Sequence, residues 1–242
     1  MDKIVTNIWV YLAASPLLWL TLTLVIYLAA QWLFRRSGGW ALLNPVALAI
    51  TVLVTLLLLT DTPYPTYFTG TQFIHFLLGP ATVALAIPLY LHWEQVRQLL
   101  LPIIVGLLTG SLTAILSAIG IAWLLGGSPR ILLSLAPKSV TTPVAMGIAE
   151  KIGGLPSLTA VLVILTGILG AIAAPALLSW LRIQNEATKG LAIGVAAHGI
   201  GTARAFQISA LAGAFSGLAI GLNALLTALL VPLIVHLLHL VP

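Results

Sequence analysis

The sequence predicts an all-α polytopic membrane protein with about six full transmembrane helices and two broken or re-entrant helical hairpins. Of its 242 residues, 60% are hydrophobic and only 6% are charged, whereas soluble domains have about 45–50% and about 25%. Long charge-free windows recur along the chain, and about 20 helical residues suffice to cross a bilayer. Because these windows lack the alternation of barrel strands, we expect helices whose partner is the lipid bilayer.

The first window, Ile4–Phe34, is too long for one crossing, and Ser15-Pro16 provides a break within it. We therefore expect an interfacial helix over Ile4–Ala14, followed by the first span. A secretory signal is the alternative for the N-terminus, although its first residues carry no net positive charge. The predicted spans are 16–34, 44–60, 71–92, 97–125, 156–181 and 208–239, and the interrupted elements are 128–152 and 187–207.

The distribution of cations predicts an orientation. Arg35, Arg36 and Arg97 follow the first and third predicted spans, so the positive-inside rule places them in the cytoplasm and the N-terminus outside. If 128–152 crosses fully, Arg182 and Lys189 lie outside. If 128–152 is re-entrant, these two cations lie inside, which gives five inside and two outside. The re-entrant arrangement fits the rule better.

The first interrupted element begins with Ser128-Pro129, a helix-start signal. Pro137 and Pro143 then break the helix in mid-segment, and Thr142 is expected to cap the second half-helix. The helix N-terminus and the Lys138 cation together predict an anion site. The alternative is a surface loop in which Lys138 reaches the headgroups. The polar candidates for substrate binding in this element are Lys138, Ser139, Thr141 and Thr142.

The second interrupted element places Gly199 and Gly201 on either side of an expected unwound turn. Its polar candidates are His198, Thr202 and Arg204. An arginine fork matches a carboxylate, and a histidine titrates near neutral pH, as proton-coupled transport requires. Alternatively, the glycines are helix-packing positions and His198 is hydrogen-bonded to a neighbouring helix.

The chain is predicted to form one integrated membrane domain, with scaffold helices over 1–127 and a substrate-site bundle over 128–242. Weak repetition, such as Leu108–Gly110 against Leu165–Gly167, indicates an inverted repeat of hairpin-plus-helix units, and paired broken segments point to a transporter's substrate site. The first two spans lack polar content and are a candidate dimer interface. An elevator-like motion of the later elements is expected from this architecture.

Composition argues against several other classes of protein. The chain has no cysteine, which excludes disulfides, thiol catalysis and cysteine-based metal sites. Its net charge of +5 comes from scattered basic residues, so nucleic acid is not an expected partner. HExxH and GxSxG patterns are absent, and Glu150 and His198 are the only candidate acid–base pair near the broken elements. We expect no enzyme activity, no cofactor and no metal site.

The strings SLAPKSVTTPVAM (Ser134–Met146) and AAHGIGTARA (Ala196–Ala205) closely resemble the LrgB/CidB family, and the likeness covers nearly the whole chain. The resemblance implies a multi-pass protein of the bacterial inner (plasma) membrane. Bacterial members are described as antiholin-like modulators of murein hydrolase export and autolysis, working beside a small holin-like LrgA/CidA protein. Plastid relatives look like glycolate/glycerate translocators, and some bacterial relatives are associated with pyruvate uptake.

The residues favour one of these two functions. A protein that only regulated perforation of the membrane would not need cations and hydroxyls at two broken helices. A binding site for small hydroxy- or keto-monocarboxylates does need both kinds of group. Lys138 or Arg204 would bind the carboxylate, and the nearby hydroxyls would bind the adjacent oxygen. The main hypothesis is a secondary transporter of glycolate, glycerate, lactate or pyruvate, and the alternative is an antiholin-like protein with an LrgA/CidA-like partner.

Overall fold

The computed structural model describes residues 15–40, 43–77, 80, 83–84 and 86–240, and the described residues contain helices and no strand. The chain divides into two compact units, Met1–Ala84 and Leu85–Pro242. The boundary between these compact units lies at 84/85, whereas the predicted boundary lies at 127/128. The predicted boundary separates two functional parts, the scaffold and the substrate site. The expected helix over Ile4–Ala14 lies outside the described residues.

The first unit consists of α2 (Pro16–Arg36), α3 (Pro45–Leu59) and α4 (Tyr64–Phe76). Each helix has a proline in its first turn, where the missing N–H costs no hydrogen bond. The Trp19 side chain is fully buried and packs edge-to-face on Tyr67, with ring centroids 5.8 Å apart. Gly70 allows α4 to approach α2, since a Cβ there would lie 2.5 Å from the Pro16 carbonyl oxygen.

The prediction of one helix over 71–92 is wrong. α4 begins earlier, at Tyr64, and ends at Phe76, whereas α6 (Ala86–Leu91) and α7 (Trp93–Gln98) are separate short helices. The sequence carries a helix-stop signal between the end of α4 and the start of α6, because Pro80 disfavours helical backbone at the residue before it. The apolar composition of this window concealed that signal.

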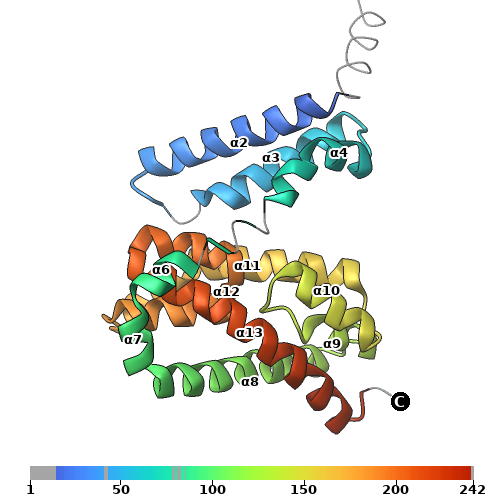
Figure 1. Cartoon of the computed structure of the whole chain (residues 1–242). Helices are drawn as coiled ribbons and strands as arrows, with labels where there is room; N and C mark the ends of the chain where they lie inside the picture. The colour runs from blue at the N-terminus through green and yellow to red at the C-terminus, as the bar shows by residue number, and fades with distance from the viewer. Residues whose placement is uncertain (1–14, 41–42, 78–79, 81–82, 85, 241–242) are drawn as a thin grey trace, which may run out of the picture. The chain divides into compact units, whose positions relative to one another are not determined.

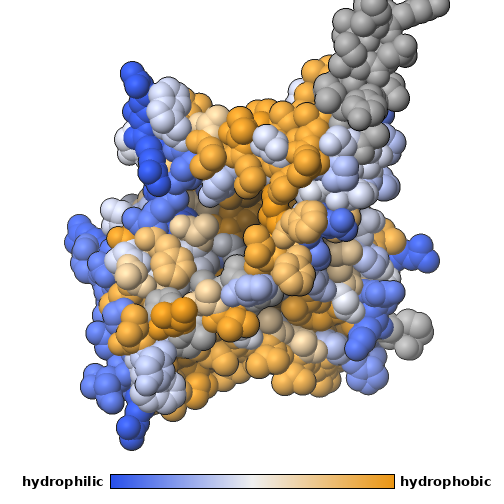
Figure 2. All heavy atoms as spheres, turned by 45° about the horizontal axis from the view of Figure 1, so that its top comes forward, coloured by the Kyte–Doolittle hydropathy of each residue, from blue (hydrophilic) through white to orange (hydrophobic). Residues whose placement is uncertain are grey.

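The second unit continues with α8 (Leu100–Leu124), α9 (Pro129–Leu135), α10 (Thr142–Lys151), α11 (Pro156–Trp180), α12 (Glu186–Ile208) and α13 (Ala210–Leu237). Within the described part of the chain, four helices are long and apolar enough to cross a membrane: α2, α8, α11 and α13. α3 is apolar but has only 15 residues. Hydrophobic side chains cover the flanks of the helices, and hydrophilic ones gather near their ends (Figure 2). The fold is that of a helical membrane protein.

α9 and α10 form a helical hairpin, which we call the first hairpin (residues 129–155), with its tip at residues 136–141 (Figure 1). The chain returns to its own first arm, because the Leu155 backbone N–H donates to Ser134 Oγ at 2.8 Å. Thr159 Oγ1 at the start of α11 donates to the Ser134 carbonyl oxygen at 3.0 Å. The first interrupted element therefore turns back on itself.

α12 is also a hairpin, which we call the second hairpin (residues 186–208). Its tip is His198, whose φ of 40° and ψ of −135° interrupt the helix. A Cβ on Gly201 would lie 2.9 Å from Ile193 Cγ2, although eight residues of straight helix rise about 12 Å. The chain therefore reverses at His198.

The prediction of an unwound turn between Gly199 and Gly201 is wrong. Both glycines lie in the helical return arm, and Gly201 fills a packing position against Ala197 and Ile193. The reversal is made by the histidine that precedes them.

The two hairpins enter the unit from opposite ends. α11 has 25 residues, so about 37 Å separate its two ends. The first hairpin leads into one end, and the second hairpin starts beyond the other end (Figure 1). The second tip reaches the middle of α11, where a Cβ on Gly167 would lie 2.7 Å from His198 Cε1. This arrangement agrees with hairpin-plus-helix units of opposite orientation.

Candidate functional site

The tips of the two hairpins are joined by a single amide on α13. Asn223 Nδ2 donates to the Ser139 carbonyl oxygen at 3.2 Å and to the Val195 carbonyl oxygen at 3.3 Å. Ser139 belongs to the first tip, and Val195 lies three residues before the second tip. The Asn223 side chain is 1% exposed. Hydrogen bonds in such a dry setting hold their partners firmly, because an unpaired polar group there is costly.

The oxygen of the same amide is also used. Asn223 Oδ1 accepts a short hydrogen bond from Ser111 Oγ of α8 and a longer one, 3.5 Å, from Thr227 Oγ1. The amide therefore links α8, α13 and both hairpins. Sequence reasoning missed Asn223 and Ser111, although an amide in the middle of an apolar span is itself a signal, since intramembrane polar residues are expensive and serve functions.

Lys138 lies on the first tip with its side chain half-buried. Its ammonium donates to Ser139 Oγ at 3.3 Å. Within the described part of the chain, the hydrogen-bond partner of this cation is thus a hydroxyl rather than a carboxylate. A partly desolvated cation without a neutralising acid favours an added anion.

His198 is 4% exposed, and its Nε2 lies 2.9 Å from the Val163 carbonyl oxygen of α11. A carbonyl oxygen only accepts, so Nε2 carries the proton. The His198 carbonyl oxygen accepts from Thr202 Oγ1 at 2.9 Å. The contact with α11 is the hydrogen bond to a neighbouring helix that we considered as the alternative to substrate binding.

Thr202 faces α13 rather than an open cavity. Its Oγ1 lies 2.6 Å from Ser216 Oγ, and both side chains are buried. Ser139 is buried as well, with its hydroxyl directed to Lys138 and its carbonyl to Asn223. These hydroxyls therefore already take part in the network that holds the tips.

The N-cap of α10 is Thr141 rather than the expected Thr142, and the Thr141 side chain makes no capping hydrogen bond. Pro143 needs a helical φ but no N–H donor, so it fits the first turn of the helix and shifts the cap outward by one residue. The first N–H groups of α10 have no partner within the helix. They follow Lys138 and Ser139 directly, so this end of α10 adds partial positive charge to the tip.

Arg204 occupies a different position from Lys138. It lies on the return arm of the second hairpin, six residues beyond the tip, which corresponds to about 9 Å of helix. Its Nη1 donates to Gln207 Oε1 of the same arm at 2.7 Å. The hydrogen bonds of the described residues connect Lys138 with Ser139 of the first tip, and Arg204 with Gln207 of the return arm. The candidate site at the tips therefore centres on Lys138.

A family model described as the LrgB-like family matches residues 23–237. The chain is 40% identical over 201 residues to the uncharacterized protein YwbG of Bacillus subtilis (strain 168), covering 83% of this chain and 89% of that protein. It is 28% identical over 206 residues to an antiholin-like protein LrgB of Bacillus cereus (strain B4264), covering 85% and 90%. No solved structure matches the chain.

Proposed function

The chain belongs to the LrgB-like family, and we propose that it is a secondary transporter of small monocarboxylates across the bacterial inner membrane. Glycolate, glycerate, lactate and pyruvate are the substrates whose size and single charge match the site. Transport is either linked to protons or an exchange of one carboxylate for another. The proposal rests on the meeting of two opposed hairpins at Asn223, next to the partly buried cation Lys138 of the first tip.

The tip of the first hairpin has the groups that a carboxylate requires. Lys138 supplies a full positive charge, and the start of α10 supplies backbone N–H donors and a helix dipole. The Ser139 hydroxyl, now paired with Lys138, can exchange that contact for the hydroxyl or keto oxygen of a substrate. A single cation suits a monocarboxylate better than a dicarboxylate, because a second carboxylate would enter the site unpaired.

Opposed hairpins also account for access from both sides. Each hairpin reaches the middle of the unit from its own end, so moving one hairpin opens one side while the other stays closed. We further propose that residues 1–127 act as a scaffold, with α2 and α3 as the dimer interface, and that residues 128–242 carry substrate by an elevator-like motion. Inter-protomer cysteine cross-linking on α2, in a chain with no cysteine of its own, tests the dimer.

The function is tested by uptake of labelled glycolate, lactate or pyruvate into proteoliposomes. We expect saturable uptake, weakened about ten- to a hundredfold in apparent affinity by Lys138→Ala, because charge-assisted hydrogen bonds of about 1.5–3 kcal/mol are lost. Lys151→Ala is the matched control, since Lys151 is an exposed cation at the end of the same hairpin. Absence of saturable flux with all three acids, or equal flux in both variants, rejects the proposal.

An antiholin-like role is the second candidate, favoured by the name of the Bacillus cereus relatives. In that role the protein would bind a small LrgA/CidA-like membrane partner and restrain murein hydrolase export. Co-purification of such a partner, with a lysis phenotype that is insensitive to Lys138→Ala, supports this role. A lysis phenotype that follows the loss of transport in the same variant supports the transporter instead.

A further inference from the structure

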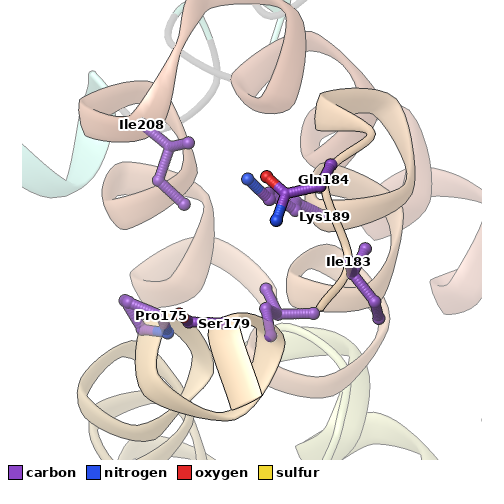
Figure 3. Close-up of a pocket in the computed structure, with 7 residues that line it drawn as sticks. Pro175, Ser179, Ile183, Gln184, Lys189 and Ile208 are labelled. Carbon is purple, nitrogen blue, oxygen red and sulfur yellow. The ribbon is translucent and has the colours of Figure 1, made fainter. Parts of the chain in front are cut away.

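A cavity lies at the base of the second hairpin, away from the tips. It has a volume of about 200 Å³. Its walls come from the last turns of α11, from the linker that follows, and from both arms of the hairpin (Figure 3). The residues used in the argument are Ser179, Gln184, Lys189 and Ile208. The hydrogen bonds that join the tips involve none of these four side chains.

The chemistry of this cavity is that of a site for an anionic headgroup. The Lys189 and Gln184 side chains line the cavity, and Ser179 lies on the α11 side of it (Figure 3). Lysine binds phosphate as a point charge, and amide and hydroxyl groups add donors. Pro175, Leu178 and Ile183 form the rest of the wall, so the ligand that fits has a charged head next to an apolar part.

The position of the cavity points to a lipid as the source of that ligand. Trp180, at the end of α11, is 78% exposed, and exposed tryptophans at helix ends mark the headgroup region. Arg182, in the linker before the second hairpin, and Lys189, in the first turns of α12, lie at the end that the positive-inside rule assigns to the cytoplasm. Basic pockets between membrane helices on that side bind anionic lipid headgroups.

We propose that this cavity binds the headgroup of an anionic phospholipid, with the phosphate on Lys189 and Gln184. Lys189 and Ile208 belong to opposite arms of the second hairpin. A lipid that contacts both arms ties them together at their base, and so restricts opening of this hairpin. The protein would then respond to the anionic lipid content of its membrane.

The test uses the full chain, purified in detergent without transport substrate, so its result is independent of the proposed transport. Thermal unfolding is measured during titration with phosphatidylglycerol or phosphatidylcholine, and bound lipid is counted by native mass spectrometry. We expect phosphatidylglycerol to stabilise the chain and phosphatidylcholine to do so at least tenfold less effectively. Lys189→Ala should weaken the phosphatidylglycerol effect about tenfold or more, and Lys151→Ala should leave it unchanged.

Two further arms separate the alternatives. Lys189→Arg keeps the charge and should retain most of the lipid binding. If Lys189→Ala is lost during purification, normal folding and lipid binding of Lys189→Arg test the site in its place. Soluble glycerol phosphate tests whether a free anion suffices. Stabilisation by glycerol phosphate at the same concentrations as by phosphatidylglycerol, equal binding of both lipids, or an unchanged response of Lys189→Ala each overturns the proposal.

Discussion

Asn223→Ala is predicted to separate the two hairpin tips. The Asn223 amide donates to the carbonyls of Ser139 and Val195 and accepts from Ser111 and Thr227. Hydrogen bonds between membrane helices contribute about 0.6 kcal/mol each on average, so the three that join α13 to α8 and to the two hairpins amount to about 1.8 kcal/mol. Leaving buried partners unpaired raises the cost, and we expect the free energy of unfolding to fall by about 2–4 kcal/mol.

The loss is measured by denaturant unfolding in detergent micelles. Ser111→Ala removes one of the four hydrogen bonds and should cost about 1 kcal/mol. Ser117→Ala is its matched control on the same helix, because the Ser117 hydroxyl is exposed and bonds only to the preceding turn. That control should change stability by less than about 0.5 kcal/mol.

Thiol accessibility then tests the position of the tip itself. Val140, in the first tip, is 1% exposed, and the chain has no cysteine that would interfere. Val140→Cys should react slowly with a water-soluble maleimide and faster when combined with Asn223→Ala. If the Asn223→Ala chain is as stable as the original and the thiol reacts at the same rate in both backgrounds, the amide does not hold the tips.

Three further substitutions test the packing. A Cβ on Gly190 would lie 2.1 Å from the Ala212 carbonyl oxygen, whereas a Cβ on Gly199 would meet nothing within 4 Å. Gly190→Ala should therefore lower the free energy of unfolding by about 1–3 kcal/mol, and the control Gly199→Ala should not lower it. Ser134→Ala removes the hydroxyl that closes the first hairpin. It should lower the free energy of unfolding by about 1–3 kcal/mol and speed backbone amide exchange in this hairpin. An unchanged exchange rate contradicts the prediction. Trp19→Ala empties a fully buried site in the first unit and should cost about 3–5 kcal/mol by the same unfolding assay.

Local signals were sufficient for part of the fold. The apolar windows predicted the extents of α8 and α11 to within a few residues because long apolar runs determine both helices, and Pro156 marks the start of α11. Pro137 and Pro143 likewise predicted the interruption at the first tip, since proline removes a backbone donor wherever it stands. These inferences need no knowledge of the neighbouring helices.

The site depended on neighbours that are distant in the sequence. His198 adopts a positive φ, which is unfavourable for a residue with a side chain, and its ring is held by Val163, which is 35 positions away. The sequence offered two glycines next to it, and the reversal was assigned to them. Asn223 and Ser139 are 84 positions apart, so no local pattern could pair them.

The choice of an amide at position 223 follows from the charge of Lys138. The bridging side chain must donate to two carbonyls, and asparagine does so without a charge. An aspartate would lose both donations and would place a negative charge beside the residue that follows Lys138, which would neutralise the one cation available to a substrate. Asn223→Asp should therefore weaken carboxylate binding more than Asn223→Ala does. Equilibrium binding of labelled pyruvate to the two purified variants measures this difference, and stronger binding by the aspartate variant would contradict an anion site at Lys138.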